Sequence, residues 1–281
     1  MWIKRVLTGA VLCFGVALAG AAQAAPLDTV RERGTLTIGV YRDFPPFSSV
    51  EKGQVVGVDV DIGREIAHRM TLAPSILEIT ADEDVDDDLR NGVWRGPVTG
   101  GVVADVMMHI PYDLNLGARN DMAVLFSPYY QETLAVARSR PTLSVVELSE
   151  ERVGVELDSL SDLYLSGAFG GSMRDSTHRY LTYADAARAI GSGDVTALMG
   201  PRSQIEDALR HLTPEQRQKM VLSIPGTPGL SMQSWPLGMA VKVDSRDLAY
   251  AVGDVVAAMV ADGTMAAIFQ KHGLTYQKVN E

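Results

Sequence analysis

The chain has 281 residues, and its 35 acidic side chains outnumber 25 Lys and Arg, which gives a formal net charge of −10. So acidic a chain does not bind nucleic acid or an anionic membrane surface nonspecifically, because like charges repel. The charge suits a basic partner or a cationic ligand, although solubility alone explains it equally well. The length is enough to bury one large core or the cores of two lobes.

The first residues predict export. Two basic residues precede an apolar run at 6–19, and Ala-Gln-Ala follows at 22–24. This is the pattern of a secretory signal peptide cleaved after Ala24. The alternative, a membrane anchor, fits less well because the run is short for a spanning helix. Cleavage would remove Cys13, the only cysteine, so we expect a periplasmic chain without a membrane anchor that folds without disulfides.

Strands alternate with helices along the first half of the chain, as hydrophobic periodicity indicates. This order predicts a largely parallel sheet covered by helices, an α/β lobe. The expected elements are a strand at 36–40 that Pro45-Pro46 ends, a strand running into a helix at 53–70, a strand at 73–80, and a strand buried on both faces at 100–110.

The second half repeats this order. We expect strands at 152–157, 177–183 and 194–200, helices at 161–169 and 184–190, and a helix at 205–212 preceded by capping-box spacing at Ser203 and Glu206. A loop and an edge strand are expected at 214–229, a strand at 238–243, a helix with an apolar stripe from Leu248 to Met259, and a short closing helix around Met265 to Phe269.

Three motifs in this order resemble the type II periplasmic solute-binding proteins, family 3, especially the amino-acid-binding branch. They are GVDVDIGREIAHRM, LFSPYY and the run from LGMAVKVDSRD to IFQKHG. The resemblance implies two α/β lobes joined by a two-segment hinge, with a solute bound in the cleft between them. It places lobe 1 at 25–130 plus 238–281 and lobe 2 at 131–237, the chain crossing after Tyr130 and returning near Trp235.

The resemblance also implies a ligand set that this sequence keeps only in part. In members that bind an amino acid, an Arg holds the carboxylate and an Asp holds the ammonium group. Arg119 matches that Arg out of register, and Gly200 stands where the Asp is expected. Phe44 matches the aromatic residue that stacks on the ligand, and Tyr41 replaces an acid. We therefore expect no tight binding of a free α-amino acid. The ligand could instead be a neutral solute, or an anion that Arg119 holds. The alternative for Arg119 is a salt bridge within the protein.

A narrower resemblance rests on one stretch, DDDLRNGVW…GGVVADVMMHIPYD. It is similar to the J proteins encoded beside quinoprotein alcohol dehydrogenases, such as MxaJ/MoxJ and XoxJ. This implies a periplasmic accessory protein that acts in the assembly, maturation or activation of a dehydrogenase dependent on pyrroloquinoline quinone (PQQ) during methanol oxidation. The implied partners are that methanol or alcohol dehydrogenase and its cytochrome c. The alternative function is a solute-binding protein of an ABC transporter for a small ligand other than an amino acid.

The acids at 82–88 invite a metal-site interpretation, which the spacing does not support. An EF-hand loop needs Gly at its sixth position and Glu at its twelfth, and no loop that begins at one of these acids has both. Acids in a first helical turn, favoured by the helix dipole, are the simpler explanation. We expect residues 90–101 to form a surface loop, with Trp94 and Arg95 as a partner contact. The alternative folds Trp94 onto its own lobe.

Three residues, His109, Tyr112 and Asp113, follow the end of a buried strand, where open α/β sheets place their ligand crevice. The alternative is a core histidine with a capping Asp. The five His residues lack metal-ligand spacing, and no nucleophile elbow, phosphate-binding loop or dinucleotide fingerprint occurs, so neither cofactor nor metal is predicted. A few proteins of this fold are dehydratases with cleft carboxylates, for which Glu156 and Asp158 are candidates, but the motifs favour a protein that is not an enzyme.

Overall fold

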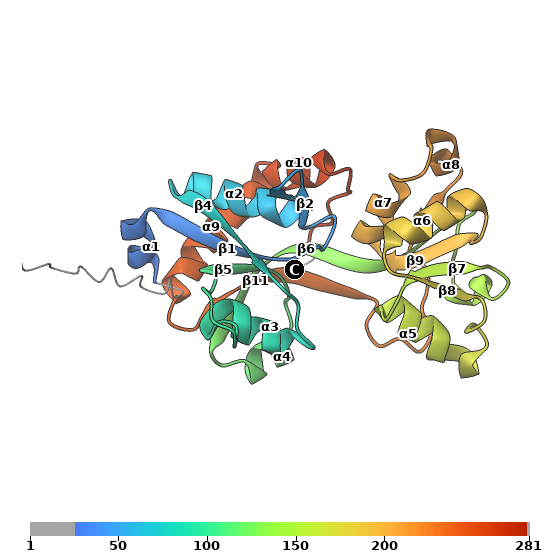
Figure 1. Ribbon diagram of the computed structural model, residues 1–281, viewed down its shortest axis with the longest axis horizontal. Helices are drawn as coiled ribbons and strands as arrows, with labels where there is room; N and C mark the ends of the chain where they lie inside the picture. The colour runs from blue at the N-terminus through green and yellow to red at the C-terminus, as the bar shows by residue number, and fades with distance from the viewer. Residues whose placement is uncertain (1–25, 280–281) are drawn as a thin grey trace, which may run out of the picture.

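Two α/β lobes lie side by side, joined by long extended strands (Figure 1). The computed structural model describes residues 26–279. Within that range the principal sheet has nine strands, in the order β4-β1-β5-β11-β6-β9-β7-β8, with β10 paired to β6. The predicted fold class, a periplasmic-binding-protein-like α/β fold with two lobes, is confirmed. The signal peptide predicted at 1–24 lies outside the described residues.

The first lobe is built on parallel strands with helices on both sides. Its strands are β1 (Thr35–Tyr41), β4 (Ala73–Ile79) and β5 (Val106–Pro111), and a two-stranded hairpin, β2 (Ser49–Glu51) and β3 (Gln54–Val56), lies beside them. Its helices are α1 (Leu27–Arg33), α2 (Val58–Arg69), α3 (Val85–Leu89), α4 (Leu114–Arg119), α9 (Arg246–Ala261) and α10 (Thr264–Lys271), with a π-turn at Arg90–Trp94.

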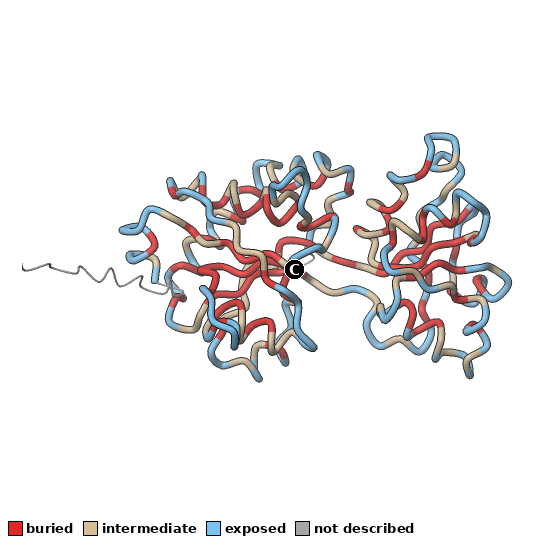
Figure 2. Tube along the Cα trace, in the orientation of Figure 1, coloured by how far each residue is buried: buried red, intermediate tan, exposed pale blue. Residues whose placement is uncertain are grey.

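The second lobe is a smaller sheet with its own buried core, as the separate red interior in Figure 2 shows. Its strands are β7 (Val153–Glu156), β8 (Thr177–Tyr180), β9 (Ala197–Pro201) and β10 (Val221–Ser223). Its helices are α5 (Leu160–Gly167), α6 (Tyr183–Ser192), α7 (Arg202–Leu209) and α8 (Pro214–Gln218), with 3-10 turns at Val145–Leu148 and Ala168–Gly171.

Two antiparallel strands carry the chain between the lobes: β6 (Ala123–Arg138) and β11 (Ser234–Lys242). β6 pairs with β11 as far as Thr133, and from Leu134 onward it pairs with β9 instead. This change of partner within one continuous strand marks the junction. Small changes in backbone angles at such a junction can change the angle between two lobes.

Three local predictions differ from the structure. β5 begins at Val106 and not at 100, and residues 100–105 have irregular backbone. Asp105 is buried just before the strand, where its carboxylate accepts a hydrogen bond of 2.8 Å from Thr37 N. The capping box predicted at Ser203 is wrong. α7 begins at Arg202, so Ser203 lies inside the helix, and its hydroxyl donates to Glu132. The expected loop at 214–229 starts with α8, which Thr213 caps.

The predicted role of the acids at 82–88 is confirmed for most of them, because Asp86, Asp87 and Asp88 lie in the first turn of α3. Asp84 is the N-cap of α3, and its carboxylate accepts a hydrogen bond of 2.9 Å from the backbone nitrogen of Asp87. Such a cap satisfies one of the free N–H groups of a first helical turn. Beyond α3 the chain is helical to Trp94, so the irregular segment begins at Arg95 and not at 90, and it continues past 101 to Asp105.

Between residues 26 and 279, no single helix combines the length and apolar character needed to cross a membrane. α9 and α10 together reach that length and composition, but a bend of 76° separates them.

Candidate functional site

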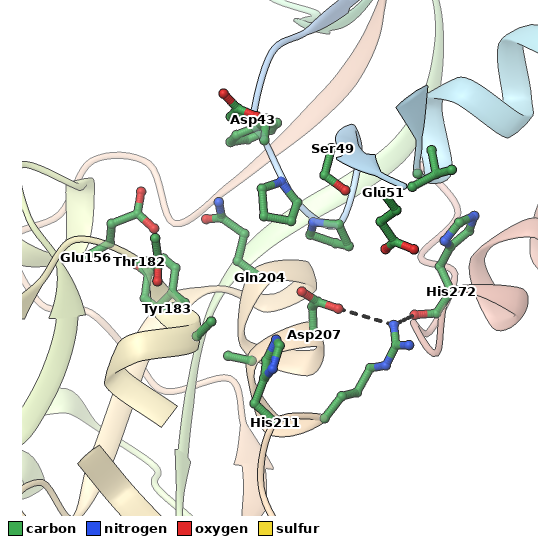
Figure 3. Close-up of a pocket in the computed structure, with 18 of the residues that line it drawn as sticks. Asp43, Ser49, Glu51, Glu156, Thr182, Tyr183, Gln204, Asp207, His211 and His272 are labelled. Carbon is green, nitrogen blue, oxygen red and sulfur yellow. Dashed lines mark hydrogen bonds and ion pairs between the residues drawn. The ribbon is translucent and has the colours of Figure 1, made fainter. Parts of the chain in front are cut away.

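A cavity of about 820 Å³ lies between the lobes, and side chains from both of them line it (Figure 3). The first lobe contributes the turn after β1, the β2–β3 hairpin, the start of α2 and the end of α10. The second lobe contributes the carboxyl end of β7, the start of α6 and one face of α7. A volume of this size fits a small organic solute.

An aromatic side chain, Phe44, forms part of the first-lobe wall. Its ring stacks on Phe47, with centroids 5.7 Å apart and planes 19° apart, and forms a T-shaped pair with the His109 ring, with centroids 4.9 Å apart. Behind it, His109 Nδ1 donates to Asp59 Oδ2 at 3.0 Å, and Tyr129 donates to the other oxygen of Asp59 at 2.6 Å. This buried hydrogen-bond network holds the aromatic wall in place.

The other cleft candidates lie outside the cavity. The Tyr41 hydroxyl donates to Asp88 at 2.8 Å, and burial, together with the Asp88 carboxylate, raises the pKa of Tyr41 well above its usual value. Asp113 caps α4 by accepting from Leu116 N at 2.8 Å, and Tyr112 is exposed. His109 supports the cavity wall from behind. Of the six candidates, Phe44 alone is among the described residues that line the cavity.

The guanidinium of Arg119 is engaged at the surface of the first lobe. Its Nε lies 2.9 and 2.8 Å from the two carboxylate oxygens of Asp86, and Asn120 also donates to Asp86. Hydrogen bonds from Arg119 and Asn120 lower the pKa of Asp86. This geometry favours the salt-bridge alternative, and a ligand-binding role for Arg119 stays a prediction.

The aromatic ring of Tyr183 fills the space beside Gly200 on the second-lobe wall. A Cβ added at Gly200 would lie 2.3 Å from the ring, closer than packed atoms approach. No side chain can therefore project from position 200 unless the ring moves. This explains in physical terms why the Asp expected from the resemblance has no room here, while the expected lack of amino-acid binding remains a prediction.

One end of the cavity carries a network of charges centred on Asp61. Its carboxylate accepts from Lys271 Nζ at 2.7 Å and from His272 Nε2 at 2.8 Å. Burial alone would raise the pKa of Asp61, but the hydrogen bonds from His272 and Lys271 outweigh it and lower that pKa to about 2.

Substituting Asp61 by Asn should remove an acid-sensitive part of the stability. A folded-state pKa below the unfolded value stabilises the protein at pH above about 4, and this contribution disappears as the pH falls through about 2. The shift corresponds to about 2 kcal/mol. Urea unfolding at pH 6 and pH 2 checks this: the loss of stability between the two pH values should be smaller in Asp61→Asn. An identical loss in both proteins would contradict it.

The end of α7 contacts the first lobe beside this network. Arg210 Nη1 donates to the backbone carbonyl of His272 and to Asp207 Oδ1, the latter at 3.2 Å (dashed lines in Figure 3). One turn earlier, Glu206 accepts from the backbone nitrogen of Thr275 at 2.7 Å. These bonds tie the segment after α10 to the second lobe, so they fix one edge of the cavity.

Among residues 26–279, no group of three or more His, Cys, Asp or Glu side chains is arranged to hold a metal ion. The five aspartates at 82–88 bond to other groups of the protein. Asp88 accepts from Asp82 N at 2.7 Å, and Asp87 pairs with Arg90.

The proposed partner-contact residues have different environments. Trp94 is partly buried and packs on the first-lobe core cluster that includes Leu89, Val93 and Ile110. Arg95 is exposed, and three residues further on Val98 is 89% exposed. The structure therefore favours the alternative for Trp94, whereas the tip of the 95–101 segment is free to meet a partner.

Replacing Trp94 by Ala should destabilise the first lobe by about 2 kcal/mol, because a partly buried indole loses its packing. Val98→Ala is the matched control and should change the free energy of unfolding by less than about 0.5 kcal/mol. Urea unfolding of both variants checks this. A Trp94→Ala protein as stable as the parent would show that the indole is available for partner contact.

Comparison with known proteins gives a family match and relatives of similar length. Residues 36–93 match the model for bacterial extracellular solute-binding proteins, family 3. The L-cystine-binding protein TcyJ of Escherichia coli K12 is 23% identical over 266 residues, which cover 92% of this chain and 90% of the relative. The ABC transporter arginine-binding protein 1 of the same organism is 20% identical over 235 residues, covering 83% and 88%.

Solved structures agree on the fold. An ancestral cationic amino acid solute-binding protein, AncCDT-1, superposes with a TM-score of 0.67 at 19% identity, covering 88% of this chain and 98% of that one. The family model thus covers part of the first lobe, and most of the chain is similar to two binding proteins and shares the fold of a solute-binding protein, as the broader resemblance predicted. The narrower resemblance to dehydrogenase-associated J proteins stays a prediction.

Proposed function

We propose that this chain is an exported receptor that captures a small solute between its lobes and delivers it to a transporter of the ABC type. The observation that carries the proposal is the cavity of about 820 Å³ between the lobes, which side chains from both of them line. A solute that touches both walls binds the closed arrangement more tightly than the open one, and it therefore shifts the lobes toward closure.

The relatives support this function over the dehydrogenase-accessory role. TcyJ is named as a cystine-binding protein and its arginine-binding relative as part of an ABC transporter. Both are binding proteins, and their similarity to this chain extends over both lobes. The wall around Phe44 also has the aromatic side chain that the resemblance assigns to ligand stacking.

The test uses the mature protein, a panel of small amines, amino acids, sugars and organic acids, and two measurements. A solute that binds should raise the melting temperature, because it stabilises the folded state by mass action. The same solute should lower the radius of gyration measured by small-angle X-ray scattering as the lobes close. If no solute in the panel does either, the receptor function is contradicted.

A second candidate is the accessory role for a PQQ-dependent methanol or alcohol dehydrogenase. It rests on the resemblance of residues 86–113, and the exposed tip at Arg95 and Val98 is the surface that would serve it. The test is an Arg95→Ala, Val98→Ser protein, in which two exposed side chains of the tip are changed and the core is left as it is. This variant should lose co-purification with a periplasmic dehydrogenase that the parent retains. A parent protein that never co-purifies with such an enzyme would contradict this candidate.

A further inference from the structure

The carboxylates of the cavity outnumber its permanent cations. Among the described residues that line it, five acids face three bases. The acids are Asp43, Glu51, Asp61, Glu156 and Asp207, and the bases are Arg64, Arg210 and Lys271. With neutral His side chains the wall therefore carries an excess of negative charge.

The three bases are already engaged by the protein. Arg64 donates to the carbonyl of Val55 at 3.0 Å and lies 3.6 Å from Asp61. Lys271 bonds to Asp61, and Arg210 bonds to Asp207 and to the His272 carbonyl. A ligand carboxylate would have to break one of these bonds to gain a cationic partner, which costs most of what the new pair contributes.

Three of the acids have no basic partner within residues 26–279. They are Asp43 and Glu51 on the first lobe and Glu156 on the second, which accepts a hydrogen bond only from the backbone of Tyr183. Glu156 is half-buried at the carboxyl end of β7, and burial raises its pKa. The charged form of a partly buried carboxylate is unfavourable without a nearby cation, so a bound cation would stabilise it.

Three acids of the cavity, Glu156, Glu51 and Asp207, lie toward its opposite ends. In Figure 3, Glu156 lies at one end, near Thr182, and Glu51 and Asp207 lie at the other, near His272. The aromatic side chain of Phe44 lines the same cavity. An aromatic face attracts a cation and adds about 0.5 to 2 kcal/mol to its binding.

We infer that the solute of this receptor is a small organic cation that carries amine or guanidinium groups and no carboxylate. The inference rests on the proposed receptor function and specifies its ligand class. Glu156 holds one positive end of the solute, Glu51 and Asp207 lie near the other, and Phe44 packs on the chain between them. The engaged state of Arg64, Arg210 and Lys271 excludes a carboxylate.

The test is a matched pair of probes: agmatine and arginine differ only in the carboxylate. Calorimetric titration of the mature protein should show agmatine binding, and arginine binding at least about tenfold more weakly, since its carboxylate meets acids and engaged bases. Glu156→Gln, which keeps the hydrogen-bond acceptor and removes the charge, should weaken agmatine binding by about tenfold or more. Asp175→Asn, an exposed acid of the same lobe outside the cavity, should leave binding unchanged.

The outcomes separate this inference from the receptor function. Arginine binding as tightly as agmatine, or unchanged agmatine binding in Glu156→Gln, would overturn the inference. A sugar or an organic acid that closes the lobes would also overturn it, but it would leave the receptor function standing. If no solute of any class binds, both are overturned.

Discussion

Asp59→Ala is expected to lower the free energy of unfolding by about 3 kcal/mol, because it leaves two buried donors without an acceptor. Asp59 is 1% exposed and accepts from both Tyr129 and His109. Burial and the Asp59 charge raise the pKa of Tyr129, so its hydroxyl stays a donor at any working pH. Urea unfolding followed by circular dichroism measures the loss.

Asp59→Asn is the matched control. Its amide oxygen can still accept the hydrogen bond from Tyr129, so it should cost clearly less than the Ala variant. Because His109 packs against Phe44, the Ala variant should also weaken the binding of any solute that contacts Phe44. Equal stability of the Ala variant and the parent would show that this network does not hold the cavity wall.

Arg138→Ala should cost about 3 to 5 kcal/mol, the range seen when one partner of a buried ion pair is removed. Arg138 is 1% exposed at the end of β6. Its guanidinium pairs with Glu147 and Glu151, the latter at 3.1 Å, and donates to the carbonyl of Pro141 at 3.0 Å. These bonds fasten the loop after β6 to the second lobe, so the variant should melt at a lower temperature.

Arg140→Ala is the control for this prediction. Arg140 also pairs with Glu151, at 2.9 Å, but its side chain is 63% exposed, so its loss should cost less than about 1 kcal/mol. Similar losses from both variants would show that the burial of Arg138 has no special energetic role.

Most of the fold could be predicted from periodicity, because buried strands and amphipathic helices have distinct hydrophobic patterns. The strand at 73–80 and the helix from Leu248 to Met259 were confirmed in this way. The hydrophobic pattern failed where tertiary contacts determine the local backbone structure. Residues 100–105 read as a strand, yet their backbone is irregular and Asp105 bonds to Thr37, and Ser203 resembles a cap but bonds to Glu132 in a distant strand.

Much less of the candidate site could be predicted. Phe44 was found through the resemblance, and Glu156 could be noticed because it ends a buried strand. Glu51 could not, since the short β2–β3 hairpin that carries it has no clear pattern. Arg119 was singled out because of its charge, and only the folded chain shows that Asp86, 33 residues away, has already engaged it.

Closure of the lobes around a cation is measured most directly as a distance between them. Spin labels on cysteines at His68 and Arg188, exposed on α2 and α6 respectively, would report it by double electron–electron resonance. The account predicts that saturating agmatine shifts the distance distribution to shorter values and that equal arginine leaves it near that of the free protein. A distribution that stays unchanged while calorimetry shows agmatine bound would contradict capture between the lobes.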